Sequence, residues 1–399
     1  MSKKTHAHVN LNTDELKDFI KHMIENNRHI QGQGKKPVAI NIEGEAGLGK
    51  TSTILQIAEE LNLQCIKLNL SHIEELGDLV GYPMKEHEMI KTKDSETLVK
   101  WVTESTMPMY ISSGYKPTGE KRMTHAAPEW IQGKEEGGIL ILDDWTRADL
   151  RFVQAVMEVI DRQEYISWKL PKDWHIVLTS NPDNGEYLVN SIDKAQRTRF
   201  ITTHLEFDIK CWARWAEENK VDSRCINFLL MNPELVSGDI NPRSITTFFN
   251  SISSIKSFED NLRIIQMIGE GSVGEEFTSM FTTFIANKLD ILISPHDMLL
   301  DANWDSVETK LHSSMNDSSG YRADIASLMA TRFSNYAVVH SNGNSINDKI
   351  LDRIKNIMKS EKLFTLDLHY VIIKTIISGN RIKFQKLLLD PEIVKLTVQ

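Results

Sequence analysis

Residues 44–51 have the types and spacing of a loop that holds phosphate groups. They match the pattern G-x-x-x-x-G-K-[ST] at every position and read Gly44, Glu45, Ala46, Gly47, Leu48, Gly49, Lys50 and Thr51. Glycines let the backbone turn tightly and point successive N–H groups at an anion, and a following helix adds the positive end of its dipole. We expect Lys50 to reach the β- and γ-phosphates, the Thr51 hydroxyl to hold Mg²⁺, and Ser52 to lie among the nucleotide-binding residues.

The residues on either side of this loop predict a strand before it and a helix after it. Residues 37–43 are mostly apolar and β-branched, and residues 51–61 place apolar side chains at helical spacing. Strand, loop and helix in this order are the context that the phosphate-binding pattern requires. The alternative, an incidental glycine-rich turn, does not predict these flanks.

Two acidic residues close a second predicted strand. Residues 139–142 are four consecutive apolar residues, which is typical of a parallel strand buried on both faces, and Asp143 and Asp144 follow them. We expect Asp143 to hold the Mg²⁺ and Asp144 to orient or deprotonate the attacking water. An acidic pair after a strand is by itself a common turn, so the interpretation depends on the loop. It also assumes a strand order in which the loop strand and this acidic strand are neighbours.

Three further polar side chains are candidates for the same chemistry. Asn181 ends a predicted strand over residues 174–182, where the amide could bind the water or the γ-phosphate. Arg197 and Arg199 lie in a segment suited to reaching a neighbouring subunit's phosphate, or alternatively are helix-end arginines that meet carbonyl groups. Arg243 follows a helix start at Asn241 and Pro242, where a cation needs an anionic partner.

Composition favours a globular protein of two or three domains. The chain has 399 residues, 41% of them hydrophobic and 25% charged, with a net charge of −9 and a pI near 5.8. This acidity disfavours general nucleic-acid binding without excluding a local basic groove. Three widely spaced cysteines indicate a reducing compartment, and no apolar run is long enough to span a bilayer. We therefore expect a cytoplasmic protein that does not enter the membrane.

The rest of the first half predicts packing elements and one insertion. Asn12 and Glu15 form a capping-box pattern that begins a helix, and residues 27–36 are expected to be a loop. A strand is predicted over residues 64–70, after which Asn69 and Ser71 could face the nucleotide or form a turn. The sequence between the loop and Asp143 is interpreted as rich in helix, with residues 84–130 as a functional or disordered insertion. Residues 165–171 are expected to be a short extended or hairpin segment.

Beyond Glu206 the sequence predicts helices. The first five are expected over residues 209–219, 222–231, 242–255, 258–268 and 274–291. Residues 310–321, rich in Ser, Asn and Asp, are interpreted as a flexible connector. Further helices are predicted over residues 323–337, 348–359 and within 366–389, with a turn at residues 341–344.

Taken together, these residues resemble those of the AAA+ ATPases, and within them the MoxR-like branch. Residues 44–51 are similar to the Walker A loop, and Asp143 with Asp144 to the end of the Walker B strand, where Arg147 and Ala148 follow as in that branch. The strand ending at Asn181 resembles sensor 1. Residues 195–200 are similar to the arginine-finger segment, in which Arg199 is the better match and Arg197 the second. Residues 241–243 are similar to the start of the sensor 2 helix. The resemblance covers residues 36–291.

The resemblance implies an α/β fold: a P-loop NTPase parallel sheet flanked by helices, which forms the nucleotide-binding domain (36–206), followed by an α-helical lid (207–292). Outside the resemblance, the sequence pattern predicts an N-terminal helix and loop (1–35) and a helical C-terminal extension (293–399). It further implies ATP and Mg²⁺ as ligands and a homo-oligomeric ring, commonly a hexamer. In such a ring Arg199 reaches the neighbour's γ-phosphate and Arg243 senses the phosphate of its own subunit.

Branch members often remodel a protein partner, as chaperones do. The insertion (residues 84–130) and the segment 165–171 lie at the positions where branch members carry elements that face the pore of the ring. The family usually has Glu where this chain has Asp144, which is one methylene shorter. Two other functions therefore stay open. One is a DNA-directed ATPase similar to a clamp loader or helicase, although the charges of the insertion nearly cancel. The other is an assembly switch that binds ATP with little turnover.

Overall fold

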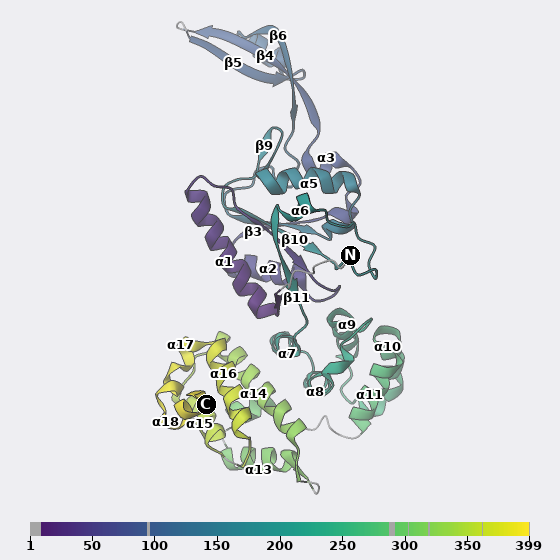
Figure 1. Cartoon of the computed structure of the whole chain (residues 1–399), viewed down its shortest axis with the longest axis vertical. Helices are drawn as coiled ribbons and strands as arrows, with labels where there is room; N and C mark the ends of the chain where they lie inside the picture. The colour runs from purple at the N-terminus through teal and green to yellow at the C-terminus, as the bar shows by residue number, and fades with distance from the viewer. Residues whose placement is uncertain are drawn as a thin grey trace. The chain divides into compact units, whose positions relative to one another are not determined.

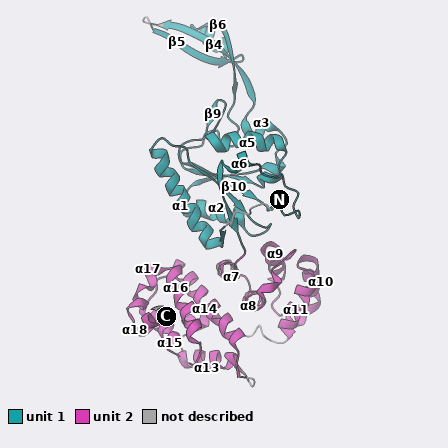
Figure 2. Ribbon diagram, viewed as in Figure 1, with its two compact units in different colours: residues 1–206 teal, residues 207–399 magenta. Residues whose placement is uncertain are grey.

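The computed structural model describes residues 9–93, 96–286, 292–301, 303–317, 320–360 and 362–398. The chain divides into two compact units, residues 1–206 and residues 207–399 (Figures 1 and 2). The first unit is α/β and the second is almost entirely helical. The predicted fold class, a parallel sheet flanked by helices and followed by helical regions, is confirmed.

The first unit contains eleven strands and six α-helices among its described residues. In chain order they are β1 (Asn10–Leu11), α1 (Thr13–Gly32), β2 (Ala39–Glu43), α2 (Lys50–Glu60), β3 (Gln64–Asn69), α3 (Leu76–Val80), β4 (Pro83–Lys93), β5 (Glu96–Thr103), α4 (Met107–Ser112), β6 (Lys116–His125), β7 (Gly138–Asp143), α5 (Leu150–Arg162), β8 (Glu164–Tyr165), β9 (Trp168–Lys169), β10 (Trp174–Ser180), α6 (Lys194–Arg197) and β11 (Phe200–Leu205). Short 3-10 turns follow β3 (Leu70–His72) and β7 (Trp145–Arg147).

Six of these strands form one parallel sheet in the order β1-β11-β2-β10-β7-β3. The strand that precedes the phosphate-binding loop, β2, therefore lies between β11 and β10. The predicted strand order is wrong on one point, because β10 separates β2 from the acidic strand β7. The consequence for the site is favourable, since the strand that ends at Asn181 now lies beside both of the others.

Alternating side chains of the central strands supply the cores on the two faces of this sheet. Ile139 and Ile141 of β7 pack with α1 and α2 on one face, and Leu140 and Leu142 pack with α5 on the other. Successive side chains of a strand point to opposite faces, so a strand covered on both sides must be apolar throughout. The sheet is thereby held as a rigid support for the polar residues at its edge.

Residues 83–125 form a separate three-stranded antiparallel sheet, which we call the arm, in the order β5-β4-β6 with α4 between β5 and β6 (Figure 1). Its base is closed by the backbone bond from Ala126 N–H to Tyr82 O, 3.0 Å long. Gly81 has φ +88°, and a Cβ there would lie 1.7 Å from Ala126 O. The expectation of helix-rich sequence between the loop and Asp143 is wrong over this stretch, because the insertion is mainly strand.

The helices of the second unit build two apolar cores. In chain order the helices are α7 (Ile209–Glu218), α8 (Ser223–Met231), α9 (Pro242–Ile252), α10 (Leu262–Ser272), α11 (Gly274–Ala286), α12 (Pro295–Leu300), α13 (Trp304–Met315), α14 (Ala323–Gly343), α15 (Asp348–Lys359), α16 (Leu366–Gly379), α17 (Arg381–Phe384) and α18 (Pro391–Val398). Phenylalanines of α8, α9 and α11 fill one core, and α12–α18 surround the other. Buried Arg332 of α14 joins them through Glu217 at 2.9 Å and Asn227 at 2.6 Å.

Three local expectations are wrong and one is confirmed. Helix α1 begins with the predicted capping box but continues to Gly32, so most of the loop expected over residues 27–36 is helix. The connector expected over residues 310–321 is occupied by the second half of α13 as far as Met315. Helix α14 continues to Gly343, so most of the turn expected at residues 341–344 is helix. The hairpin expected within residues 165–171 is present as β8 and β9. The end of the helix predicted to reach residue 291 lies outside the described residues.

Candidate nucleotide-binding site

The carboxyl ends of three neighbouring strands meet at one edge of the sheet. Glu43 of β2 is in register with Ser180 of β10, and Leu178 of β10 with Leu142 of β7. The phosphate-binding loop and Asn181 follow directly after β2 and β10, while Asp143 is the last residue of β7 and Asp144 follows it. Parallel strands present ligand-binding residues at their carboxyl ends, so this edge is where a ligand of the first unit would bind.

Two glycines give the loop its turn. Gly47 and Gly49 have φ values of +82° and +85°, which residues with a side chain rarely adopt. Gly49 is the N-cap of α2 and offers no side chain to the first helical N–H groups, and no acidic residue lies in the first turn. The end of the helix therefore presents backbone donors to an anion without a competing carboxylate of its own first turn.

Lys50 is buried against the loop and the end of β10. Its Nζ donates to Gly44 O at 2.6 Å, to Glu45 O at 2.9 Å and to Asn181 Oδ1 at 3.0 Å. Only 7% of Lys50 and 6% of Asn181 are exposed. These bonds hold the ammonium inside the curve of the loop, which is where a phosphate-binding lysine is needed.

Asp143 is the centre of a hydrogen-bond network. Its Oδ1 accepts from the hydroxyls of Thr51 and Thr179, each at 2.6 Å, and its Oδ2 contacts Lys67 Nζ at 2.9 Å. Burial acts to raise the pKa of Asp143, but the bonds from Thr179, Thr51 and Lys67 lower it below the ordinary value. The carboxylate is therefore held ionised beside the Thr51 hydroxyl.

The backbone of Asp144 leaves the strand in a left-handed conformation, with φ 51° and ψ 37°. Its N–H donates to Thr179 Oγ1 at 3.1 Å, and that hydroxyl in turn donates to Asp143. Asp is one of the few side chains that tolerate this region. The half-buried Asp144 carboxylate has no hydrogen bond among the described residues, so it is available to a water molecule at the edge of the sheet.

The structure brings Lys50, Thr51, Asp143 and Asn181 into one network, although two of these pairs are more than 90 residues apart in sequence. Arg197 and Arg199 are exposed where α6 meets β11, and Arg197 Nε donates to Ile192 O at 3.2 Å. Arg243 is exposed in the first turn of α9, in the other unit.

Sequence reasoning missed Lys67 as a partner of Asp143, and it gave Thr179 no role of its own. The register of β3 against β7 decides the first contact, since Asn69 of β3 lies opposite Asp143. No local pattern signals that pairing, whereas Thr179 is two residues before Asn181 on the same strand. The sequence predicts that Asn69 and Ser71 either face the nucleotide or form a turn, and the structure shows the turn. Asn69 Oδ1 accepts from the Ser71 N–H at 3.2 Å and from the Ser71 hydroxyl at 2.7 Å.

The oxygen donors beside the loop suit Mg²⁺. A hard divalent cation of this size prefers carboxylate, hydroxyl and water oxygens, and here the ionised Asp143 carboxylate and the Thr51 hydroxyl lie within hydrogen-bonding distance of each other. The residues present thus fit the ion that the sequence pattern predicts.

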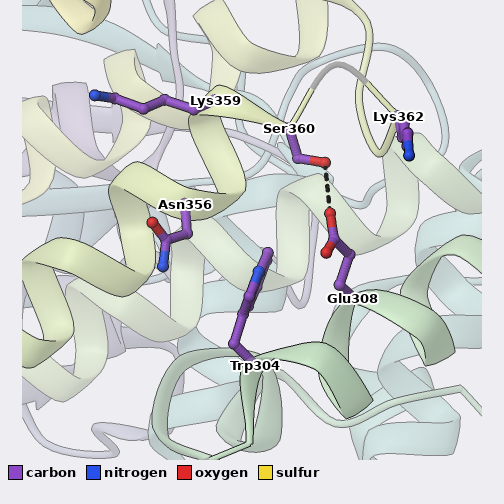
Figure 3. A pocket seen from close by; sticks show the side chains of 6 residues that line it. All are labelled: Trp304, Glu308, Asn356, Lys359, Ser360 and Lys362. Atoms are coloured by element: carbon purple, nitrogen blue, oxygen red, sulfur yellow. Dashed lines mark hydrogen bonds between the residues drawn. The ribbon is translucent and has the colours of Figure 1, made fainter.

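A hollow of about 520 Å³ in the second unit offers no comparable arrangement (Figure 3). Its lining residues include Trp304, Asn356 and Lys362, and the Ser360 hydroxyl donates to Glu308 across it at 3.0 Å. Lys359 points away from the others in Figure 3, and it is paired with Asp390 and Glu392. The candidate chemistry is therefore concentrated at the sheet edge of the first unit.

Over the described part of the chain, every helix is too short or too polar to cross a bilayer.

Comparison with known proteins gives weak likenesses. No protein-family model matches the chain. Uridine kinases from two strains of Limosilactobacillus reuteri are 28% identical over 140 residues, which is 32% of this chain. The chain spans 62% of the length of these curated relatives.

Two solved structures of RuvB variants from Thermotoga maritima are also similar. One is 12% identical with a TM-score of 0.36, covering 77% of this chain and 78% of that one. The other is 14% identical with a TM-score of 0.29, covering 90% of each chain. Because both TM-scores are below 0.5, we base no functional conclusion on these two likenesses.

Proposed function

We propose that this protein is an AAA+ ATPase of the MoxR-like branch, which hydrolyses ATP in a ring and uses the energy to remodel a protein partner. The observation that carries the proposal is the convergence of Lys50, Asn181 and the Thr51–Asp143 pair at the edge of β2, β10 and β7. A phosphate loop alone binds many nucleotides. A loop joined to an ionised carboxylate and a buried polar side chain on the intervening strand supports hydrolysis of a triphosphate.

Each residue has a defined task in this proposal. The loop N–H groups and Lys50 bind the β- and γ-phosphates, and Thr51 with Asp143 would hold Mg²⁺, which supplies positive charge that offsets the charge of the phosphates. Asp144 orients the attacking water and accepts its proton, because no described residue forms a hydrogen bond with its carboxylate. Asn181 fixes Lys50 from one side and offers its amide N–H₂ to the water or the γ-phosphate.

The assembly is proposed from the resemblance and from exposure. Arg199 is exposed, and we assign it to the γ-phosphate of the neighbouring subunit in a homo-oligomeric ring, proposed as a hexamer. Arg243 is assigned to the phosphate of its own subunit. The partner is a protein client or adaptor. Cys65, Cys211 and Cys225 form no disulfide in the structure, which suits a cytoplasmic location.

Steady-state hydrolysis tests the proposal directly. Purified protein should release phosphate from ATP with Mg²⁺, and Lys50→Ala should abolish this release. Its mass in solution should rise to that of a ring when ATP is added. Detectable turnover that Lys50→Ala abolishes would exclude the assembly switch, whereas ATP-driven assembly without turnover would replace the ATPase by that switch.

The likeness to uridine kinases favours one alternative, a P-loop kinase that transfers phosphate to a nucleoside. Incubation with ATP and uridine separates the two functions. Formation of a phosphorylated nucleoside would support the kinase, and phosphate release that uridine does not change would support the ATPase. Strong, salt-sensitive stimulation by DNA would instead favour a DNA-directed motor.

A further inference from the structure

The segment between Asn181 and α6 is fastened to the phosphate-binding loop by one tyrosine. The Tyr187 hydroxyl donates to Glu45 Oε2 at 2.5 Å and accepts from Ala46 N–H at 3.3 Å. Further along, the segment is fastened to the turn after β7, where Asn190 N–H donates to Thr146 O and Asn190 Nδ2 to Ala148 O, each at 2.7 Å. The segment that carries the tyrosine is thus also anchored at Asn190, outside the loop.

The contact matters because Glu45 places a negative charge in the phosphate-binding loop. It is the second residue of the loop, its side chain is exposed, and it is the only acidic side chain within residues 44–51. Phosphate groups and a carboxylate at the mouth of the same anion cradle repel each other. The position that the Glu45 carboxylate takes therefore affects how strongly the loop holds phosphate.

We propose that Tyr187 is a positioning residue of the nucleotide site, which raises the affinity for triphosphate by holding the Glu45 carboxylate to one side. The phenol oxygen also fixes the Ala46 N–H, so the tyrosine orients both the charge and the backbone of the loop entrance. Burial and the bond to Glu45 raise the pKa of Tyr187, so the hydroxyl stays protonated and can donate at neutral pH. A merely structural role is disfavoured because Lys50 already fixes the loop through Gly44 O and Glu45 O.

The inference rests on the proposed binding of ATP, and its test separates the two. We would measure the affinities for ATP and ADP of the full chain and of Tyr187→Phe, Glu45→Gln and the double variant. Tyr187→Phe removes only the hydroxyl, which frees the Glu45 carboxylate. ATP affinity should then fall about fivefold and ADP affinity about twofold, because ATP carries more negative charge. Glu45→Gln should restore both affinities in the Tyr187→Phe background, because the carboxylate that the missing hydroxyl no longer holds is then absent.

Salt gives a readout that a structural role would not move. The loss of ATP affinity in Tyr187→Phe should shrink as ionic strength rises, since screening weakens a charge repulsion near the surface. Glu45→Asp, which keeps the charge but draws it back from the hydroxyl, should lose ATP affinity in the same salt-dependent way. This variant keeps the test available if Tyr187→Phe is poorly folded.

The opposite results would overturn the inference. They are unchanged ATP affinity in Tyr187→Phe, equal losses for ATP and ADP, or a double variant as weak as Tyr187→Phe alone. Failure of the wild-type chain to bind any nucleotide would instead overturn the proposed function, which is a separate outcome of the same titration.

Discussion

The ammonium of Lys50 donates to the side-chain oxygen of Asn181 across 3.0 Å, although 131 residues separate the two in sequence. The bond joins the phosphate-binding loop to the end of the strand beside it. It also fixes the amide of Asn181, whose oxygen accepts from Lys50, so that its N–H₂ group is left to donate elsewhere.

Asn181→Ala should therefore slow hydrolysis more than it weakens binding. We expect the turnover number to fall on the order of 10–100-fold, because a positioned polar donor is lost, while ATP affinity changes about threefold or less. Phosphate release and equilibrium binding of a fluorescent ATP analogue measure the two separately. Asn184→Ala, at an exposed position of the following segment, is the control. A large loss of affinity with an unchanged turnover number would contradict the assignment.

Lys50→Ala should abolish binding itself. The variant removes the cation and also the bonds to Gly44 O and Glu45 O that shape the loop. We expect ATP affinity to fall roughly 100-fold or more, since a buried charged hydrogen-bond donor is lost together with the loop conformation. Lys134→Ala removes an exposed lysine of the same unit and should bind ATP as the wild type does.

Asp143→Asn should lower stability in a pH-dependent way. Because the folded-state pKa of Asp143 lies below its unfolded value of 3.8, the stabilisation is fully present above about pH 4 and is lost as pH falls through the lower, folded pKa. Near pH 7 the free energy of unfolding of the variant should be about 1–2 kcal/mol lower than that of the wild type. The difference should shrink as pH falls below 3.8. Denaturant unfolding curves from pH 2.5 to 7 measure it, with the exposed Asp161→Asn as control.

The parts of this fold that the sequence predicts are those set by local physics. The capping pair Asn12 and Glu15 begins α1 as expected, and β7 is recognisable because a strand buried on both faces must be apolar throughout. The phosphate loop is likewise local, since its glycines and Lys50 act within eight residues. These features need no knowledge of which strand pairs with which.

The parts that could not be predicted depend on pairing between distant segments. Strand β6 of the arm, with nearly every residue exposed, carries charged and polar side chains on both faces, so no apolar alternation marks it. The contact between Lys67 and Asp143 exists only because β3 lies beside β7 in one particular register. The place of β10 between β2 and β7 is also a matter of strand order, which local periodicity leaves undetermined.

Removal of the arm should leave the nucleotide site intact. Residues 83–125 begin and end beside each other, because Ala126 N–H bonds to Tyr82 O, so a short Gly-Ser linker can replace them. We expect ATP affinity within about twofold of the wild type and a melting temperature within a few degrees, since the arm adds little to the main cores. Calorimetry and nucleotide titration provide the check.

Gly81→Ala supplies the contrast for that experiment. A Cβ at Gly81 would lie 1.7 Å from Ala126 O, and φ there is +88°. The variant should disturb the base of the arm and lower the melting temperature of the full chain by several degrees, consistent with a strained position that costs roughly 1–3 kcal/mol. If the linker variant lost nucleotide binding while Gly81→Ala kept it, the arm would be part of the site.

Arg199→Ala should keep ATP affinity and lose hydrolysis, because in the proposed ring its guanidinium serves the neighbouring subunit. The residue is exposed between α6 and β11, and Arg197 nearby already donates to Ile192 O, so Arg197→Ala is the matched control with a smaller expected loss. Mixing Arg199→Ala with Asp144→Asn subunits should restore activity, since some interfaces then combine an intact Asp144 with an intact Arg199. In randomly mixed rings at equal amounts, on the order of a quarter of the interfaces qualify. Mixing Arg199→Ala with the Arg199→Ala/Asp144→Asn double variant should restore nothing. Absence of recovery at every mixing ratio would contradict the assignment of Arg199 to a neighbour's site.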